Sequence, residues 1–250
     1  VLNILLSNDD GYYAKGIEML FDALSQFANV TMVAPENNCS GASSSLTLKN
    51  PLRIRKFKDE GYYINGTPSD CVFMALTRIL QDPPDLLVSG INHGANLGDD
   101  VLYSGTVGAA LGGRFLNIPC LAISITSLKP NHLETAVRVS SELIKNNIEY
   151  LASNPVLNIN IPDVSYTELK GFKVTRLGRR AMPESNSQNQ DAYGDDIHWV
   201  GPPPPPKDLD EGTDFHAIHN KIVSITPLIS DLTNYEQLKS IEEWSELISQ

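Results

Sequence analysis

Two adjacent carboxylates, Asp9 and Asp10, follow an apolar run over residues 2–7, with only Asn8 between, and precede Gly11. A short apolar run is typical of a buried parallel strand, so both acids are expected at the carboxyl end of a strand. Two carboxylates about 4 Å apart repel each other by roughly 1 to 4 kcal/mol, and a divalent cation would offset that repulsion. The alternative is a polar turn in which the two side chains point apart and cap the next helix. Taken alone, the stretch favours neither hypothesis.

Two further polar loops follow predicted strands. Residues 36–45, rich in Ser and Asn, come after a strand predicted over residues 30–34. Residues 92–100, dense in Asn, Gly and Asp, come after a strand predicted over residues 85–91. Each loop alone is ordinarily interpreted as solvated, but open α/β sheets bind their ligands at the carboxyl ends of their strands. We therefore expect both loops to meet the two acids at one edge of the sheet.

Ser104, Gly105 and Thr106 lead into a helix predicted over residues 107–116. Free backbone N–H groups and the helix dipole at such an N-terminus can bind a phosphate. An ordinary hydroxyl cap on a helix rich in Gly and Ala explains the same residues when they are taken alone. The expected convergence of three polar loops favours phosphate binding.

The side chains expected at this edge offer only oxygen ligands. They are the carboxylates of Asp9 and Asp10, the hydroxyls of the serine loop, and the amide oxygen of Asn92 or Asn96. Hard oxygen ligands without His or Cys select Mg²⁺, Mn²⁺ or Ca²⁺ over zinc. Such a cation beside an anion-binding helix N-terminus indicates phosphate chemistry, and hydrolysis of a phosphomonoester is the simplest outcome.

Spacing disfavours two other kinds of site. His216 and His219 are expected on a strand, where their side chains would point to opposite faces, so a zinc pair is not expected. Cys71 and Arg78 have six residues between them on a predicted helix, which does not match the five-residue phosphate loop of cysteine phosphatases. A thiol nucleophile is therefore disfavoured.

The elements that would position these residues alternate between strands and helices. The strand over residues 2–7, a helix beginning near Gly16 and the strand over residues 30–34 imply a right-handed crossover and a doubly wound sheet. Residues 1–165 are therefore predicted to form a Rossmann-like α/β core, with three α/β/α layers around a mostly parallel sheet. Further predicted elements are a hairpin over residues 52–65, a helix with Thr67 as its N-cap and Pro68 at its first position, strands over 119–125 and 156–161, and a helix over 132–152.

Residues 166–250 are predicted to form a C-terminal extension of this core. Strands are expected over residues 172–177 and 197–200, on either side of a polar segment, and over 222–226. Prolines 202–206 predict a stiff polyproline stretch. An amphipathic helix is expected over residues 235–249, and its apolar stripe needs a surface to cover it. The stripe consists of Leu238, Ile241, Trp244 and Ile248.

Composition excludes several partners. The formal net charge of -11 opposes binding to a polyanion, so no nucleic acid is expected as a partner. No apolar run approaches the roughly 20 residues that span a bilayer, so no membrane contact is expected. The three cysteines show no paired spacing, which indicates a reducing, cytoplasmic location.

Several ordered motifs resemble the SurE survival-protein nucleotidases, and the resemblance runs nearly end to end. They are LLSNDDG at residues 5–11, SGASSSLT at 40–47, GTPSDCV at 66–72, SGINHGANLG at 89–98, YSGTV at 103–107, TRLGRR at 175–180, GTDFHAI at 212–218, and SITPL at 224–228 followed by DLT at 231–233. So many motifs in the same order make chance similarity implausible.

The resemblance implies a set of site residues. One divalent metal ion per subunit, usually Mg²⁺ or Mn²⁺, would be bound by Asp9, Asp10, Ser40 and Asn96. Asp9 and Asn8 would be catalytic. The phosphate would be surrounded by Asn8, Ser43, Asn92, Ser104, Gly105 and Thr106, so that it lies between the cation and the helix N-terminus.

The resemblance also implies the reaction and the assembly. The family hydrolyses nucleoside 5'-monophosphates and 3'-monophosphates to nucleoside and phosphate, and some members attack short polyphosphate. Its members form homodimers or homotetramers by exchanging a hairpin and the C-terminal helix. Tyr235 follows the DLT motif where some relatives carry a histidine that is thought to assist at the site, so no general acid is assigned.

Two alternatives stay open. A phosphatase with an aspartyl nucleophile would normally need carboxylates separated by one residue, whereas Asp9 and Asp10 are adjacent. A non-catalytic nucleotide-binding or regulatory module would use the two acids only as helix caps.

Overall fold

The computed structural model describes residues 1–147, 156–183 and 188–248. A nine-stranded sheet forms its centre, with the strand order β3-β4-β2-β1-β5-β6-β7-β11-β8. Neighbouring strands from β4 to β7 in this order are parallel, whereas β3 and β11 pair antiparallel with β4 and β7. The bounds are β1 (Leu2–Ser7), β2 (Ala28–Pro35), β3 (Ile54–Lys58), β4 (Gly61–Ile64), β5 (Leu86–His93), β6 (Cys120–Ile125), β7 (Val156–Ile161), β8 (Phe172–Val174) and β11 (Val223–Leu228).

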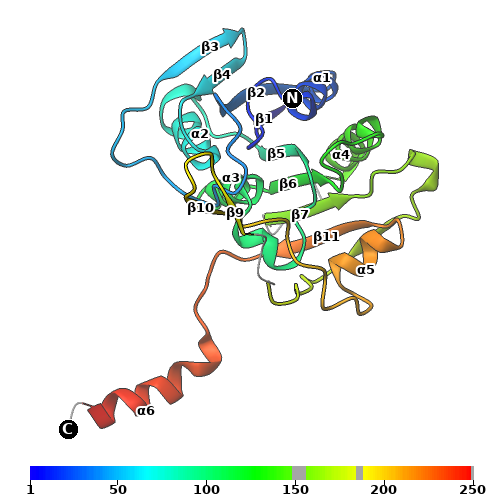
Figure 1. The fold of residues 1–250 in the computed structure, drawn as a ribbon. Helices are drawn as coiled ribbons and strands as arrows, with labels where there is room; N and C mark the ends of the chain where they lie inside the picture. Colours follow the sequence, from blue (N-terminus) through cyan, green and yellow to red (C-terminus); the bar gives the residue numbers. More distant parts are fainter. Residues whose placement is uncertain (148–155, 184–187, 249–250) are drawn as a thin grey trace.

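Helices cover both faces of the sheet (Figure 1). One face packs against α1 (Lys15–Leu24) and α4 (Leu133–Asn147), and the other packs against α2 (Pro68–Met74) and α3 (Gly105–Gly112). Successive residues of β1 point to opposite faces, so Leu6 joins the first core and Leu5 the second. Both faces are buried, which explains why the strand sequences are continuous apolar runs. The predicted three-layer α/β/α fold with a mostly parallel sheet is confirmed.

Local signals at two helix starts explain where these helices begin. The Thr67 side chain accepts a hydrogen bond from the Asp70 N–H, and Pro68 occupies the first turn of α2. Ser104 caps α3 by accepting from the Val107 N–H at 3.1 Å, so this helix begins earlier than the predicted residue 107. The helix predicted over residues 132–152 is α4, and its predicted residues 148–152 lie outside the described residues.

The C-terminal extension contributes to the main sheet through β8 and β11. It also forms a separate two-stranded sheet of β9 (Gln188–Gln190) and β10 (Asp196–His198). The polar segment predicted to lie between two strands therefore supplies a strand itself. Its pattern gave no strand signal because an exposed hairpin needs no apolar face.

The expectation that His216 and His219 lie on a strand was wrong. Both belong to the short helix α5 (Asp214–His219), whose N-cap Thr213 accepts from the His216 N–H at 3.1 Å. A helix of six residues is too short to show a helical period. Spacing therefore gives no reason against a histidine pair, but no group of three or more His, Cys, Asp or Glu side chains within the described ranges could hold a metal.

The helix α6 (Leu238–Ile248) extends away from the rest of the molecule (Figure 1). Its predicted apolar stripe is solvent-exposed, with Leu238, Ile241, Trp244 and Ile248 between 55% and 66% accessible. A short 3-10 helix, η5 (Tyr235–Gln237), precedes it. Within the described part of the chain, every helix is too short or too polar to cross a membrane.

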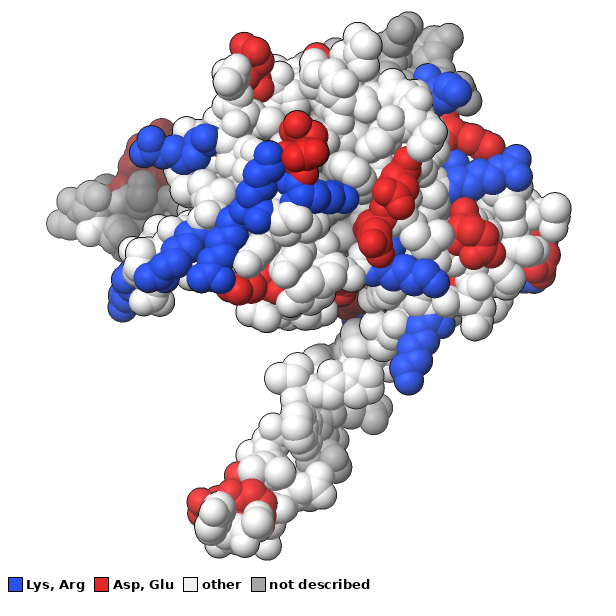
Figure 2. Space-filling view, turned by 90° about the horizontal axis from the view of Figure 1, so that it is seen from above, with Lys and Arg blue, Asp and Glu red and all other residues white. Residues whose placement is uncertain are grey.

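The outer strand β3 is basic although the chain as a whole is acidic. Its exposed residues include Arg55 and Lys56, and Figure 2 shows Lys and Arg side chains in a row on the face where β3 lies. Like charges along an edge strand oppose pairing with the edge of another sheet.

Candidate active site

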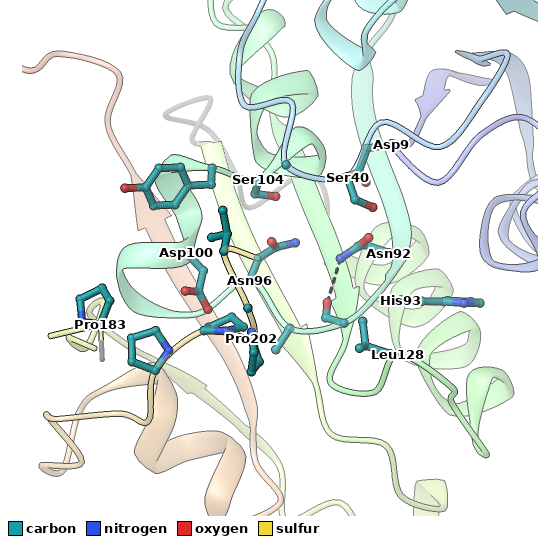
Figure 3. Close-up of a pocket in the computed structure, with 18 of the residues that line it drawn as sticks. Asp9, Ser40, Asn92, His93, Asn96, Asp100, Ser104, Leu128, Pro183 and Pro202 are labelled. Carbon is teal, nitrogen blue, oxygen red and sulfur yellow. Dashed lines mark hydrogen bonds between the residues drawn. The ribbon is translucent and has the colours of Figure 1, made fainter. Parts of the chain in front are cut away.

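The predicted polar loops meet at the carboxyl ends of β1 and β5, beside the N-terminus of α3. They line one side of a pocket of about 820 Å³. Figure 3 shows Asp9, Ser40, Asn92, Asn96 and Ser104 on this side, with Pro202 and Leu128 on the opposite side beside Asp100 and His93. The predicted site residues that line the pocket are Asp9, Ser40, Asn92, Asn96 and Ser104.

Asp9 is the most deeply buried acid of the site, with 3% of its surface exposed. Its Oδ1 accepts a hydrogen bond of 2.6 Å from the Thr106 hydroxyl. The pKa of this carboxyl is raised to about 6, chiefly because of its burial and also because of the charge of Asp10, whereas the Thr106 hydrogen bond acts in the opposite direction. A buried carboxylate of this kind is stabilised by a cation, and burial disfavours its charge without one.

Gly105 allows α3 to approach Asp9. A Cβ atom at this position would lie 2.8 Å from the Asp9 Cβ and 2.9 Å from its Oδ2. Any other residue would therefore push the helix N-terminus away from the carboxylate. The glycine brings the first-turn N–H groups of α3, which have no partner within the helix, to the same place as the buried acid.

Asp10 is held by its neighbours and is not among the residues that line the pocket. Its Oδ1 accepts from Asn38 Nδ2, and its Oδ2 accepts from the His93 N–H, both at 3.1 Å. The Oδ1 of the same Asn38 accepts from the Ser40 N–H at 2.9 Å. Asn38 therefore ties the two predicted metal-binding residues Asp10 and Ser40 together.

Asn8 is fully buried behind the turn that carries the two acids. Its Nδ2 donates to the Gly11 carbonyl at 2.8 Å, whereas its Oδ1 has no partner among the described residues. The structure therefore places this side chain in the turn rather than in the pocket. Its predicted contact with phosphate stays a prediction.

Asn96 is fixed by buried side chains of two strands. Its N–H donates to Asn160 Oδ1 at 2.8 Å, and its carbonyl accepts from Asn160 Nδ2 at 3.0 Å and from Asn158 Nδ2 at 2.8 Å. Its own Nδ2 donates to the Ser124 hydroxyl at 2.8 Å. Sequence reasoning missed these three partners, although two Asn residues inside an apolar strand are an unusual pattern that could have indicated them.

The remaining predicted phosphate contacts lie around α3 and β5. The Ser43 hydroxyl donates to the Leu102 carbonyl at 2.7 Å, and its backbone adopts φ +53° against Gly108 of α3. Asn92 Nδ2 donates to the Gly94 carbonyl at 2.8 Å. The Thr106 hydroxyl is fully buried on Asp9, so it does not line the pocket.

The outer wall of the pocket is the segment 200–205, which contains four of the five prolines. Arg180 holds this segment: its guanidinium pairs with Asp100, donates to the Pro204 carbonyl at 2.9 Å and lies 4.8 Å from the Phe215 ring centre. Sequence reasoning included Arg180 only as part of a motif. Its partner Asp100 lies on η2 (Gly98–Leu102), the short 3-10 helix that follows Asn96.

The oxygen ligands fit a hard divalent cation. Asp9, Ser40 and Asn96 face one pocket, Asp10 adjoins them, and no ion pair compensates either acid within the described ranges. The buried charge of Asp9 is the observation that calls for such a cation. The fold and the site together define an α/β protein with an oxygen-lined pocket at the carboxyl edge of a parallel sheet, where such folds bind their ligands.

Comparison with known proteins gives the family. The family model described as survival protein SurE matches residues 4–184. Proteins named 5'-nucleotidase SurE are similar over nearly the whole chain: that of Mannheimia succiniciproducens is 50% identical, covering 98% of this chain and 99% of the relative, and that of Methylococcus capsulatus is 50% identical, covering 97% of each. The chain belongs to the SurE family.

A solved structure is similar in fold as well. The crystal structure of the SurE protein from Aquifex aeolicus matches with a TM-score of 0.87 and 42% identity, and the match covers 97% of this chain and 99% of that protein. The resemblance inferred from the sequence motifs is thus confirmed in both sequence and fold.

Proposed function

We propose that this protein is a metal-dependent phosphatase that hydrolyses nucleoside 5'-monophosphates to nucleoside and phosphate. The observation that carries the proposal is the buried Asp9 carboxylate, which lies against the N-terminus of α3 at the inner end of the pocket. The names of the similar proteins support the same reaction.

Asp9, Asp10, Ser40 and Asn96 would hold one Mg²⁺ or Mn²⁺ ion. The bound ion would supply Lewis acid chemistry, since it polarises a phosphoryl oxygen and lowers the pKa of water. Thr106 would orient the Asp9 carboxylate beside the ion by donating a hydrogen bond to its Oδ1. Asn38 positions Asp10 and Ser40 beside it.

The phosphate would bind at the N-terminus of α3. The N–H groups of the first helical turn have no partner within the helix and would donate to phosphoryl oxygens. That of Thr106 already donates to the Asp9 carboxylate. Charge that develops on these oxygens during hydrolysis would be stabilised by the same donors. Asn92 and Ser104 line the pocket next to them.

The outer part of the pocket suits a nucleoside. Its wall is formed largely by apolar side chains, including Leu128, Val200 and Pro202, and water would be excluded from the ring faces of a bound base. We extend the proposal to nucleoside 3'-monophosphates and short polyphosphate, since only the terminal phosphate needs to reach the inner end.

Assembly and location are part of the proposal. A homodimer or homotetramer formed through the C-terminal extension would cover the exposed apolar stripe of α6. A cytoplasmic location is supported by the three cysteines, Cys39, Cys71 and Cys120, which are all free thiols.

A substrate panel tests the reaction. Phosphate release is measured from nucleoside 5'- and 3'-monophosphates and from polyphosphate, each with Mg²⁺, Mn²⁺ or Ca²⁺. We expect release from 5'-monophosphates with Mg²⁺ or Mn²⁺. No release from any mononucleotide would favour a non-catalytic nucleotide-binding module, and a trapped phosphoaspartate would favour an aspartyl nucleophile.

A further inference from the structure

The central strands β6 and β7 carry polar residues where apolar ones are expected. Ser124, Asn158 and Asn160 are all 0% exposed. Ser124 and Asn160 are register partners across the two strands, and Asn158 lies two residues before Asn160 on the same face. Burying amides and hydroxyls in a sheet is unfavourable unless they are hydrogen-bonded. Their shared partner is Asn96, in a loop more than 60 residues away from β7 along the chain.

Asn160 fixes the backbone of Asn96. Its carboxamide accepts from the N–H of Asn96 at 2.8 Å and donates to the carbonyl of the same residue at 3.0 Å. This two-point contact sets both the position and the direction of the loop. The loop residue Asn96 is thus held in place by a side chain of the strand β7.

Ser124 and Thr106 fix the side chain of Asn96. Its Nδ2 donates to the Ser124 hydroxyl at 2.8 Å and lies 3.5 Å from the Thr106 hydroxyl. Thr106 in turn donates its proton to Asp9 Oδ1. Because the Nδ2 of Asn96 points toward these two hydroxyls, its Oδ1 must point the other way, toward the pocket. An amide oxygen can bind a cation, whereas an amide NH₂ group cannot.

We propose that Ser124 and Thr106 are positioning residues that select which atom of the Asn96 carboxamide faces the cation. The inference rests on the proposed function, since it takes Asn96 and Asp9 as metal ligands. Thr106 couples the two ligands, because one hydroxyl orients both the carboxylate and the amide. Partners of this kind are typically worth 10- to 100-fold in metal affinity.

Mn²⁺ binding to the metal-free protein tests the proposal without requiring turnover. Free Mn²⁺ is measured by electron paramagnetic resonance during a titration of the wild type and of Ser124→Ala. We expect the variant to bind Mn²⁺ about 10-fold more weakly, because its Asn96 carboxamide can turn its Nδ2 toward the cation.

Ser224→Ala is the matched control. Ser224 is also 0% exposed and lies on the neighbouring strand β11, opposite Asn160, but its hydroxyl is hydrogen-bonded to Thr175 at 2.8 Å and makes no hydrogen bond with Asn96 in the described part of the chain. We expect its Mn²⁺ affinity to stay within about twofold of the wild type, even if both variants lose similar thermal stability. Equal weakening by both substitutions, or no weakening by Ser124→Ala, would overturn the proposal.

A second pair of variants covers the case in which Ser124→Ala does not fold. Thr106→Val keeps the side-chain shape without the hydroxyl, and Thr106→Ser keeps the hydroxyl. We expect weak Mn²⁺ binding only for Thr106→Val. These experiments measure Mn²⁺ binding and not turnover. If the protein bound Mn²⁺ but showed no phosphatase activity, only the proposed reaction would be contradicted. A wild type that binds no Mn²⁺ would overturn the inference itself.

Discussion

The two walls of the pocket are built in different ways. The inner wall consists of Asp9, Asn96 and their neighbours, which are fixed by fully buried residues of strands and by the N-terminus of α3. The outer wall is a proline-rich surface segment that is held by the half-buried Arg180. In the proposed function, the reacting groups would be fixed by the core, whereas the contacts to the nucleoside would depend on a segment that is held by a few polar contacts. The two walls should respond differently to mutation.

Asp9→Asn should have the largest effect on the inner wall. We expect phosphate release to fall on the order of 1,000-fold or more, since about 4 kcal/mol of transition-state stabilisation by a cation would be lost. Because the substitution removes a buried charge, the metal-free variant should melt at the same temperature as the wild type or higher. Steady-state kinetics and thermal unfolding check both expectations. Full activity would show that the inner wall does not act through this carboxylate.

Asp214→Ala tests the connection between the two walls, which is made by the hydrogen bonds of the Asp214 carboxylate. This buried carboxylate accepts from the N–H groups of Gly98, Gly178 and Phe215 at 2.7 to 2.9 Å, so it links the loop after Asn96 to the segment before Arg180. Unpaired buried N–H groups should lower the free energy of unfolding by about 3 kcal/mol. Denaturant titration measures this loss. Asp210→Ala, at an exposed position nearby, serves as the control and should change stability by less than about 0.5 kcal/mol.

Arg180→Gln tests the outer wall alone. Loss of the contacts to Asp100 and Pro204 should loosen the proline segment and raise the KM for a nucleoside monophosphate by about 10-fold, whereas kcat should change little. With p-nitrophenyl phosphate, which lacks a nucleoside, both constants should stay near wild type. Arg179→Gln at the exposed neighbouring position is the control. A fall in kcat with both substrates would show that the two walls are not independent.

Trp244→Glu should have the smallest effect on the pocket. The side chain is 57% exposed on α6, a helix that extends away from the rest of the molecule in Figure 1, and a charge there should weaken any contact between subunits. We expect light scattering to give a smaller assembly, while kcat per subunit stays within about threefold of the wild type. Lys239→Ala on the same helix is the control. An unchanged mass would show that the apolar stripe does not form the interface.

Much of the fold could be predicted from the sequence because both faces of the sheet are buried. Strands such as β1 and β5 are then continuous apolar runs, and the polar residues that follow them must lie at their carboxyl ends. Position along a strand thus predicted that Asp9 and Asn92 lie on one pocket. The helix α5 is too short and the strand β9 is too polar to show such a pattern, so neither was predicted.

The contacts that orient the site could not be predicted in the same way. The hydrogen bonds from Asn96 to Asn160 join residues 64 positions apart, and they depend on strand order and register. Likewise, the pairing of Arg180 with Asp100 depends on how the extension folds over the sheet. The order of residue types along the chain does not show which distant segments lie side by side, so it predicts neither contact. Two Asn residues in a buried strand could have indicated an unusual role but not their partner.

The central claim is that hydrolysis of the phosphomonoester requires a divalent cation bound by the oxygen ligands of the pocket. Removing the metal and then adding it back tests this claim most directly. The protein is treated exhaustively with a chelator, and phosphate release from AMP is measured before and after Mg²⁺ or Mn²⁺ is added back. We expect release to fall to background without metal and to return in proportion to the metal bound, near one ion per subunit. Undiminished release from the metal-free protein would contradict the account.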